Sequence, residues 1–503
     1  MNKVRVRFAP SPTGPLHIGG VRTALFNYLF AKKHGGDFLL RIEDTDQKRY
    51  VEGAENYILE AFEWCGLPFD ESVKTGGNYG PYRQSERKAI YEKYISELLA
   101  LGHAYYAFDT AEELETMRIR LQEAKSDIQL YNAETRGEMK NSFTMSADEV
   151  QKLLANGENY VIRFKMPSDE ILKIHDIIRG EITVNTRLLD DKVLFKSDGM
   201  PTYHFANIVD DHLMEISHVI RGEEWLPSMP LHILLYRSFS WEAPQFAHLP
   251  LILKPKGNGK LSKRDGDQMG FPVFPIQWKT PEGEIYAGYR EDGYLPDGFL
   301  NMLAVLGWNS GTEQEIYTMD ELISAFSLEK IGKSGAKFDP EKTKWFNHQY
   351  IIRKSDAELA TLFMPILEGK GIKSSAEYVE KVMSQIKERA NFLSDFWDLA
   401  TYFFQAPENY DEKMVKKNWK EGISDKIREI ALLISNLTDF STETIESSIK
   451  EFITEKQYGL GQIMNALRLV IVGEAKGASL FEIMHTIGQK ETLLRIENGI
   501  KKL

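Results

Sequence analysis

The chain of 503 residues is 42% hydrophobic and 11% aromatic, which excludes a disordered polypeptide and predicts three or four domains. Its formal net charge of −12 excludes tight nonspecific coating of DNA, although local Lys and Arg residues can still bind phosphates. The chain has a single cysteine, Cys65, which excludes an internal disulfide. No segment has the roughly 18 consecutive apolar residues that cross a bilayer. We therefore expect a cytoplasmic protein without a membrane partner.

The first 42 residues have the pattern of a strand, a turn, a helix and a second strand. Residues 4–8 alternate apolar and polar side chains, which predicts a strand, and the Pro and Gly residues of 9–16 force a turn. From His17 onward apolar residues recur every three or four positions, which predicts a helix that ends at Gly35. Residues 37–42 predict the next strand. This order is typical of a crossover unit in a parallel sheet.

The junction between the first strand and the helix carries polar and glycine residues. Ligands of open α/β sheets bind beyond the carboxyl ends of the strands, against helix N-termini. Gly19 and Gly20 allow a phosphate or an adenine to approach the backbone. His17 can donate a hydrogen bond to a phosphate oxygen on which charge develops, with Ser11 and Thr13 close by. Taken alone, His-x-Gly favours a helix-capping or surface histidine.

A second candidate cluster lies far downstream. Residues 254–266, KPKGNGKLSKRDG, predict a mobile basic loop that ends at Gly266. Lys260, Lys263 and Arg264 place three cations within five residues, and Ser262 adds a donor. Adenylyl transfer spreads negative charge over the α-phosphate and the leaving pyrophosphate, and cations on a closing loop stabilise such charge. Taken alone, KLSKR favours a solvated run of charges.

Together the two clusters resemble the paired motifs of class I aminoacyl-tRNA synthetases. His17-Ile18-Gly19-Gly20 is similar to the "HIGH" motif, and Lys260-Leu261-Ser262-Lys263-Arg264 is similar to the "KMSKS" motif. Gly20, Leu261 and Arg264 depart from the consensus, as they commonly do in the glutamate-specific branch, and residues 7–20 resemble that branch in particular. The resemblance covers essentially the whole chain, through residues 41–46, 80–87, 203–207, 221–225, 338–350, 467–468 and 480–482.

The resemblance implies an α/β fold: a class I, Rossmann-like catalytic domain with an inserted connective domain, followed by an all-α anticodon-binding region. The helical period of the sequence beyond about 340 agrees with that last region. The implied parts are the first catalytic half at 1–100, a connective insertion that contacts the tRNA acceptor end at 101–195, the second catalytic half with the KLSKR loop at 196–268, a stem-contact region at 269–340 and the anticodon-binding region at 341–503. Residues 271–290 look like an additional hairpin-forming insert, and packing over the stem-contact region is favoured for it over RNA contact.

The implied activity is the activation of L-glutamate with ATP, with release of pyrophosphate, followed by transfer to the 3′-terminal adenosine of tRNA(Glu). Glutamate has one ammonium and two carboxylates, so its site needs an anion and at least two cations or forked donors. The resemblance places Arg7 at the side-chain carboxylate, Arg221 at the α-carboxylate and Glu43 at the ammonium. The complete implied glutamate set is Arg7, Ala9, Ser11, Glu43, Tyr203, Asn207 and Arg221. The implied ATP set is Thr13, His17, Gly19, Gly20, Lys260 and Lys263, and the implied catalytic set is His17, Gly19, Gly20, Lys260, Ser262, Lys263 and Arg264.

No resident metal is expected. Asp44 and Asp46 favour hydrogen-bonding roles, and Mg²⁺ should arrive bound to the phosphates of ATP. Many relatives carry a zinc site after a Tyr-Tyr pair, but Ala107 and Asp109 stand here where thiols would be, so we expect no zinc. The family also implies a monomer.

The sequence disfavours several alternative functions. Ala9 and Ser11 disfavour a glutamine-specific enzyme, the length disfavours a short paralogue that glutamylates a tRNA base, and the helical tail disfavours a simple nucleotidylyltransferase. The intact motifs disfavour a catalytically silent RNA-binding protein. Whether the glutamine tRNA is also charged stays open. Lys413, Lys416, Lys417 and Lys420 predict a helical stripe beside Trp419, for which a solvated face is favoured over contact with tRNA phosphates.

Overall fold

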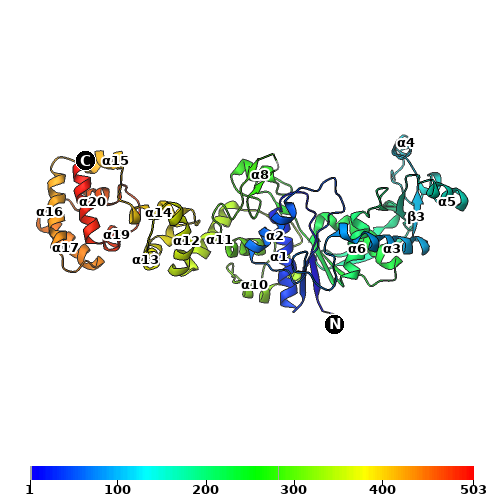
Figure 1. Ribbon diagram of the computed structural model, residues 1–503, viewed down its shortest axis with the longest axis horizontal. Coiled ribbons are helices and arrows are strands. Elements are labelled where there is room, and N and C mark those ends of the chain that lie inside the picture. The colour runs from blue at the N-terminus through cyan, green and yellow to red at the C-terminus, as the bar shows by residue number, and fades with distance from the viewer. Residues whose placement is uncertain (1–2, 281) are drawn as a thin grey trace. The chain divides into compact units, whose positions relative to one another are not determined.

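The computed structural model describes residues 3–280 and 282–503, and Figure 1 labels its helices and strands. The chain forms two compact units. One runs to Glu291 and includes Leu300–Pro340, and the other comprises Asp292–Phe299 and Glu341–Leu503. The first unit mixes strands and helices, and the regular elements in the described residues of the second are helices. This division confirms the predicted α/β region followed by an all-α region.

The N-terminal crossover unit is confirmed. It consists of β1 (Arg5–Phe8), α1 (Ile18–Lys33) and β2 (Asp37–Leu40), and β1 pairs in parallel with β2. All four residues of β1 are buried, as in a strand that is covered on both faces. Gly36 is required before β2, because a Cβ there would lie 2.2 Å from the carbonyl oxygen of Val4. Because β1 and β2 are parallel, the turn that follows β1 lies at the carboxyl end of both strands.

The parallel sheet continues with strands from the second half of the unit. The backbone N–H of Ser217 donates to the carbonyl of Arg5 at 2.9 Å, so β8 (His218–Gly222) lies beside β1. β9 (Gln245–Leu249) pairs in parallel with β8, which gives the order β2, β1, β8, β9. Further helices of this unit are α2 (Ala54–Cys65), α3 (Lys88–Ala100), α6 (Tyr203–Leu213), α7 (Met229–Ser238) and α10 (Met319–Ala325).

Residues 101–195 form a separate small sheet and extend the large one. β3 (Ala104–Ala107), β4 (Val161–Phe164) and β7 (Val193–Phe195) make an antiparallel sheet. β5 (Ile171–Asp176) pairs in parallel with β9, and β6 (Gly180–Asn185) pairs with β5, so these two strands belong to the large sheet. Figure 1 shows β3 beside the helices of this segment, α4 (Ala111–Glu123) and α5 (Ala147–Ala155).

The structure corrects the expected basic loop. Helix α8 (Lys263–Met269) begins inside the KLSKR segment, so the loop ends at Ser262 and not at Gly266. The cause is local capping: the carboxylate of Asp265 accepts a hydrogen bond from the backbone N–H of Ser262 at 2.9 Å. Neighbouring elements of the unit are β10 (Ile252–Leu253), which pairs with β13 (Ala336–Lys337), and α9 (Pro296–Val305).

Residues 271–290, which we call the insert hairpin, follow α8. β11 (Trp278–Lys279) pairs antiparallel with β12 (Ile285–Tyr286), so the predicted hairpin is present. Gly288 is required in its second arm, because a Cβ there would lie 2.1 Å from the carbonyl carbon of Ile276.

The second unit has a core of isoleucines and leucines spaced by three or four residues. Ile427, Ile430 and Ile434 of α16 (Ile423–Ser435) are fully buried, as the helical period predicted. Its helices are α11 (Pro340–Arg353), α12 (Asp356–Gly369), α13 (Ala376–Ile386), α14 (Asp395–Phe404), α15 (Glu412–Asn418), α16 (Ile423–Ser435), α17 (Thr442–Glu455), α18 (Leu460–Val472), α19 (Leu480–Ile487) and α20 (Gln489–Lys502). No helix in the described part of the chain has the length and apolar character needed to cross a membrane.

The predicted helical stripe of Lys413, Lys416, Lys417 and Lys420 is wrong for Lys420. Helix α15 ends at Asn418, so Lys420 does not continue the helical face. Met414 and Asn418 are buried one turn apart, which leaves Lys413, Lys416 and Lys417 exposed on the rest of this short helix.

Candidate active site

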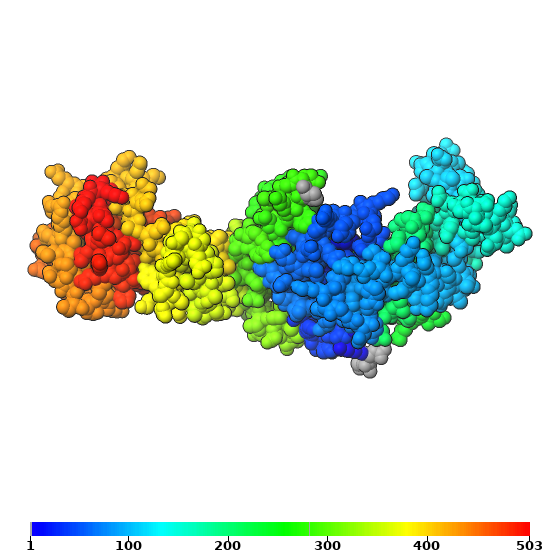
Figure 2. Space-filling view, viewed as in Figure 1, coloured from blue at the N-terminus to red at the C-terminus, as the bar shows by residue number. Residues whose placement is uncertain are grey.

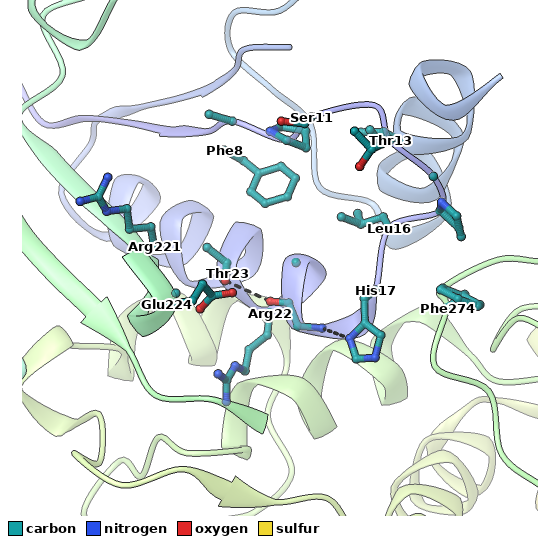
Figure 3. A pocket seen from close by; sticks show the side chains of 18 of the residues that line it. Phe8, Ser11, Thr13, Leu16, His17, Arg22, Thr23, Arg221, Glu224 and Phe274 are labelled. Atoms are coloured by element: carbon teal, nitrogen blue, oxygen red, sulfur yellow. Dashed lines mark hydrogen bonds between the residues drawn. The ribbon is translucent and has the colours of Figure 1, made fainter. Parts of the chain in front are cut away.

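A cavity of about 900 Å³ opens at the carboxyl ends of the parallel strands. Its walls come from the turn after β1, the first turn of α1, helix α6, strand β8 and residues 250–286. Figure 3 shows Arg221 toward one end of this cavity, and His17 with Phe274 toward the other. All of these walls belong to the first unit.

The cavity brings together nearly all of the residues singled out from the sequence. Two candidates, Ser262 and Arg264, lie outside the lining. Ser262 caps α8, and the Arg264 side chain is exposed on that helix. The candidates that line the cavity are Arg7, Ala9, Ser11, Thr13, His17, Gly19, Gly20, Glu43, Tyr203, Asn207, Arg221, Lys260 and Lys263.

His17 is the N-cap of α1 and is held in one tautomer. Its Nδ1 accepts a hydrogen bond from the backbone N–H of Gly19 at 3.2 Å, so Nδ1 carries no proton. Burial, assisted by the charge of Lys260, lowers the pKa of His17 to about 4. The neutral ring therefore carries its proton on Nε2, which is buried and has no hydrogen-bond partner among the described residues. Nε2–H is a donor ready for an acceptor in the cavity.

A buried network of charges lies under the opposite part of the cavity. Arg7 donates through Nε and Nη2 to both carboxylate oxygens of Asp211, at 2.9 and 3.1 Å. The two N–H groups of Nη1 and the second N–H of Nη2 are not used by this pair. Arg41 donates to Asp211 at 2.7 Å and to Glu43 at 3.1 Å. Asn207 donates to the same Glu43 oxygen at 3.2 Å. Each arginine is thereby fixed by an acidic group on another part of the fold.

A third carboxylate completes the charge balance of this network. Asp210 accepts hydrogen bonds from Arg87 at 2.7 Å and from Gln84 and Tyr91, both at 2.8 Å, and it lies 3.7 Å from Arg41. Buried charges are tolerated when they are paired and hydrogen-bonded, and here three arginines face three carboxylates.

Glu43 faces the cavity with a carboxylate that favours a cation. Burial raises the pKa of the Glu43 carboxyl, although Arg41 and Arg7 pull it down. A positively charged group that enters the cavity would relieve this cost of burial. Glu43 is therefore suited to hold an ammonium.

Arg221 is positioned by a chain of buried side chains. It donates through Nη1 to the Tyr203 hydroxyl at 2.9 Å and through Nε to Nε2 of His248 at 3.1 Å. Nδ1 of His248 lies 2.7 Å from the carboxylate of Asp176. Burial lowers the pKa of His248, and this effect exceeds the opposite effect of Asp176, which raises it. Neutral His248 thus donates through Nδ1 and accepts through Nε2, which orients the guanidinium of Arg221.

The KLSKR lysines have defined contacts at the other end of the cavity. Nζ of Lys260 lies 3.1 Å from the carboxylate of Glu224. Nζ of Lys263 lies 3.3 Å from the ring centroid of Tyr286 in the insert hairpin. Together with His17, these groups supply donors and positive charge where phosphate oxygens can bind.

Several lining residues were missed by the sequence reasoning. Arg22 lines the cavity from α1, donates to the carbonyls of Pro250 and Leu306, and has a pKa lowered to about 10 by burial. Glu224 and Trp225 also line the cavity, although the sequence indicated a role only for Arg221 in residues 221–225. The insert hairpin adds Phe274, Trp278, Thr280, Glu282 and Tyr286 to the lining, although the sequence favoured packing elsewhere.

The acidic residues near the cavity have protein partners. Asp44 accepts from the backbone N–H and the hydroxyl of Ser85, at 2.8 and 2.6 Å. Asp46 pairs with Arg49 at the surface. Within the described ranges, no group of three or more His, Cys, Asp or Glu side chains is arranged to hold a metal ion. Just after β3, Asp109 accepts a hydrogen bond from the Tyr131 hydroxyl at 3.1 Å.

Comparisons with known proteins agree over the whole chain. The family described as "tRNA synthetases class I (E and Q), catalytic domain" matches residues 3–345, and "Anticodon binding domain" matches residues 358–500. The chain is 59% identical over 501 residues to the glutamate–tRNA ligase of Flavobacterium johnsoniae and 57% identical over 505 residues to that of Porphyromonas gingivalis. Each alignment covers 100% of this chain and 99% of the relative.

Two solved structures are similar in fold as well as in sequence. One is a glutamate tRNA ligase from Elizabethkingia meningosepticum in complex with its amino acid, with a TM-score of 0.95, 54% identity and complete coverage of both chains. The other is the glutamate-tRNA synthetase of Elizabethkingia anophelis, with a TM-score of 0.91, 54% identity and coverage of 99% of this chain and 100% of that one.

We predict that His17 stays neutral down to about pH 5, because its pKa is lowered to about 4. In a ¹⁵N-histidine NMR titration, the ring that is lost from the spectrum of the His17→Asn variant should carry its proton on Nε2 and show that lowered pKa. The urea-unfolded chain serves as the reference, because its histidines should titrate with a pKa of about 6.5. Titration of His17 in the folded protein at the unfolded value, or a proton on Nδ1, would contradict this assignment.

We predict that Asp176→Asn disturbs the chain of contacts to Arg221. Both Asp176 oxygens accept hydrogen bonds, from Ile178 and Arg179 on one side and from His248 on the other, so an amide group meets donors in either orientation. The variant should be less stable by about 1–3 kcal/mol in urea unfolding. The control is Asp127→Asn at an exposed position. Equal stability of the two variants would count against the proposed arrangement.

Proposed function

This chain belongs to the glutamate- and glutamine-specific class I tRNA synthetases, within the glutamate–tRNA ligases, and we propose that it activates L-glutamate with ATP and transfers it to tRNA(Glu). The observation that carries the proposal is a cavity with two chemically different ends. One end has buried arginines and Glu43 for a dicarboxylic amino acid. The other has His17 and the two KLSKR lysines for a triphosphate.

In the first step, the α-carboxylate of glutamate attacks the α-phosphorus of ATP. The bond to the pyrophosphate oxygen breaks, which leaves glutamyl-adenylate and pyrophosphate. Negative charge develops on the phosphate oxygens, where Nε2–H of His17 and the ammonium groups of Lys260 and Lys263 can stabilise it. The reaction needs no protein nucleophile, because positioning and charge stabilisation suffice.

In the second step, a hydroxyl of the terminal adenosine of tRNA attacks the activated carbonyl. Glutamate is then esterified to the tRNA, and AMP leaves. The family uses the 2′-hydroxyl for this step, and we propose the same for this chain. Family members of this branch generally need bound tRNA before they activate glutamate, and we expect that requirement here.

The geometry supports a specific way of holding glutamate. We assign the side-chain carboxylate to the N–H groups of Arg7 that Asp211 does not use, and the α-carboxylate to Arg221 with Tyr203. Glu43 receives the ammonium, next to Asn207. Glutamine is disfavoured because its side-chain amide carries no charge and directs N–H donors at the remaining N–H groups of Arg7, where glutamate offers carboxylate oxygens.

We propose that different regions of the chain contact different parts of the tRNA. Residues 101–195 would contact the acceptor end, residues 269–340 the stem and residues 341–503 the anticodon. We further propose that Mg²⁺ arrives with ATP and that the protein binds no zinc. We expect it to act as a cytoplasmic monomer.

Glutamate-dependent ATP–pyrophosphate exchange tests the proposal. We predict exchange only when glutamate tRNA is present, followed by charging of that tRNA. His17→Asn should lower exchange by about 10²–10³-fold, because Asn keeps an acceptor for the cap of α1 but lacks the Nε2–H donor. Absence of exchange from folded protein under all conditions would overturn the proposal. Charging of glutamine tRNA as well would widen the tRNA specificity.

A further inference from the structure

The insert hairpin (residues 271–290) has no role in the two chemical steps above, yet five of its side chains line the cavity. In the space-filling view, the green surface that includes this segment lies against the blue surface of the N-terminal residues (Figure 2). Its contacts with both signature motifs indicate what it does there.

The first arm of the hairpin contacts the HIGH-like motif. The carbonyl of Val273 accepts the backbone N–H of Ile18 at 3.0 Å. Ile18 is the first residue of α1, whose N–H has no partner inside the helix. The ring of Phe274 stands edge-on to the ring of His17, with centroids 6.3 Å apart and an interplanar angle of 87°. Both contacts fix the helix end that presents His17 to the cavity.

The beginning of the insert hairpin and its second strand contact the KLSKR segment and its helix. The backbone N–H of Phe271 donates to the carbonyl of Gly266 in α8 at 3.2 Å. The ammonium of Lys263 lies over the ring of Tyr286, 3.3 Å from its centroid, which is the geometry of a cation–π contact. Phe274 and Tyr286 are themselves neighbours, with centroids 6.1 Å apart. One pair of rings therefore connects His17 to Lys263.

The hairpin is fixed to the body of the catalytic unit through α2. The hydroxyl of Tyr57 donates to the carbonyl of Ile276 at 2.6 Å, and its ring packs edge-on against Trp278 at 5.2 Å. Arg290 pairs with Glu60 of α2 at 2.8 Å. A segment held at these points can position the groups that it contacts.

RNA stacking is a poor alternative use for these rings. Phe274 and Trp278 are buried, at 7% and 8% exposure, so their faces are not available to a nucleic-acid base. The exposed side chains near the hairpin tip include Glu282 and Glu284, which repel a phosphate backbone.

We propose that the insert hairpin couples the two signature motifs of the nucleotide site, and that Tyr286 is a positioning residue that orients the ammonium of Lys263 toward the phosphates of ATP. The inference rests on the proposed function. A lysine side chain loses considerable rotamer freedom when it is fixed, and the Tyr286 ring restricts Lys263 before ATP binds. The ring covers one side of the ammonium, and its other N–H donors remain for phosphate oxygens.

A double-mutant cycle on the affinity for a nonhydrolysable ATP analogue, measured by calorimetry, tests the proposal. Tyr286→Leu keeps an apolar side chain beside Phe274 but removes the π face, and should weaken binding about three- to tenfold. Tyr286→Phe keeps the ring and should change binding less than about twofold. In a Lys263→Met background, Tyr286→Leu should have no further effect. Ile285→Ala, at the exposed neighbouring position of β12, is the matched control.

The proposal is overturned if Tyr286→Leu weakens binding to the same extent in the natural protein and in the Lys263→Met variant, because the ring would then act only on the fold. It is also overturned if Tyr286→Leu and Ile285→Ala bind alike. The cycle measures binding and not turnover, so it stands apart from the exchange assay. If Tyr286 and Lys263 are coupled in binding but no ATP–pyrophosphate exchange occurs, the positioning role is supported and the proposed function is refuted. If exchange occurs but the two residues are not coupled, the proposed function is supported and the positioning role is refuted.

Discussion

The buried contact of Arg41 with the carboxylates of Asp211 and Glu43 is the constraint on which the site depends. Arg41 is fully buried and lies just beyond β2, Asp211 belongs to α6, and Glu43 faces the cavity. Asp211 also holds Arg7 of β1, so one network joins β1, the residue that follows β2, and α6. Removing a single partner would leave an uncompensated buried charge, which costs about 3–5 kcal/mol. The same groups that hold the fold together thereby set the charge of the binding site.

The two ends of the cavity differ in how their buried groups are charged. At the amino-acid end, arginines keep their charge because buried carboxylates neutralise them, and Glu43 has a raised pKa that an ammonium can relieve. At the nucleotide end, His17 is kept neutral by burial and donates a hydrogen bond without adding charge, while the lysines remain at the more exposed edge. The overall charge of −12 hides this local arrangement.

Local sequence patterns predicted local structure well and long-range contacts poorly. Alternation and helical period were sufficient for β1 and α1, because both depend on nearest neighbours, and family resemblance brought His17 and Lys263 to one site. The roles of Asp211 and His248 were not predictable, since each depends on an arginine that is distant in the sequence, 204 and 27 residues away. The start of α8 was foreseeable from the spacing of the residues that cap it. The position of Tyr286 required the three-dimensional path of the insert hairpin.

Calorimetric titration of the protein with glutamate and with glutamine tests most directly whether the buried charge network sets amino-acid recognition. We predict that the natural protein prefers glutamate by at least about tenfold. Arg7→Lys keeps the charge opposite Asp211 but cannot also reach a ligand carboxylate, so the preference should fall toward parity. An unchanged preference in the folded Arg7→Lys protein would contradict the account, because the carboxylate would then be recognised elsewhere.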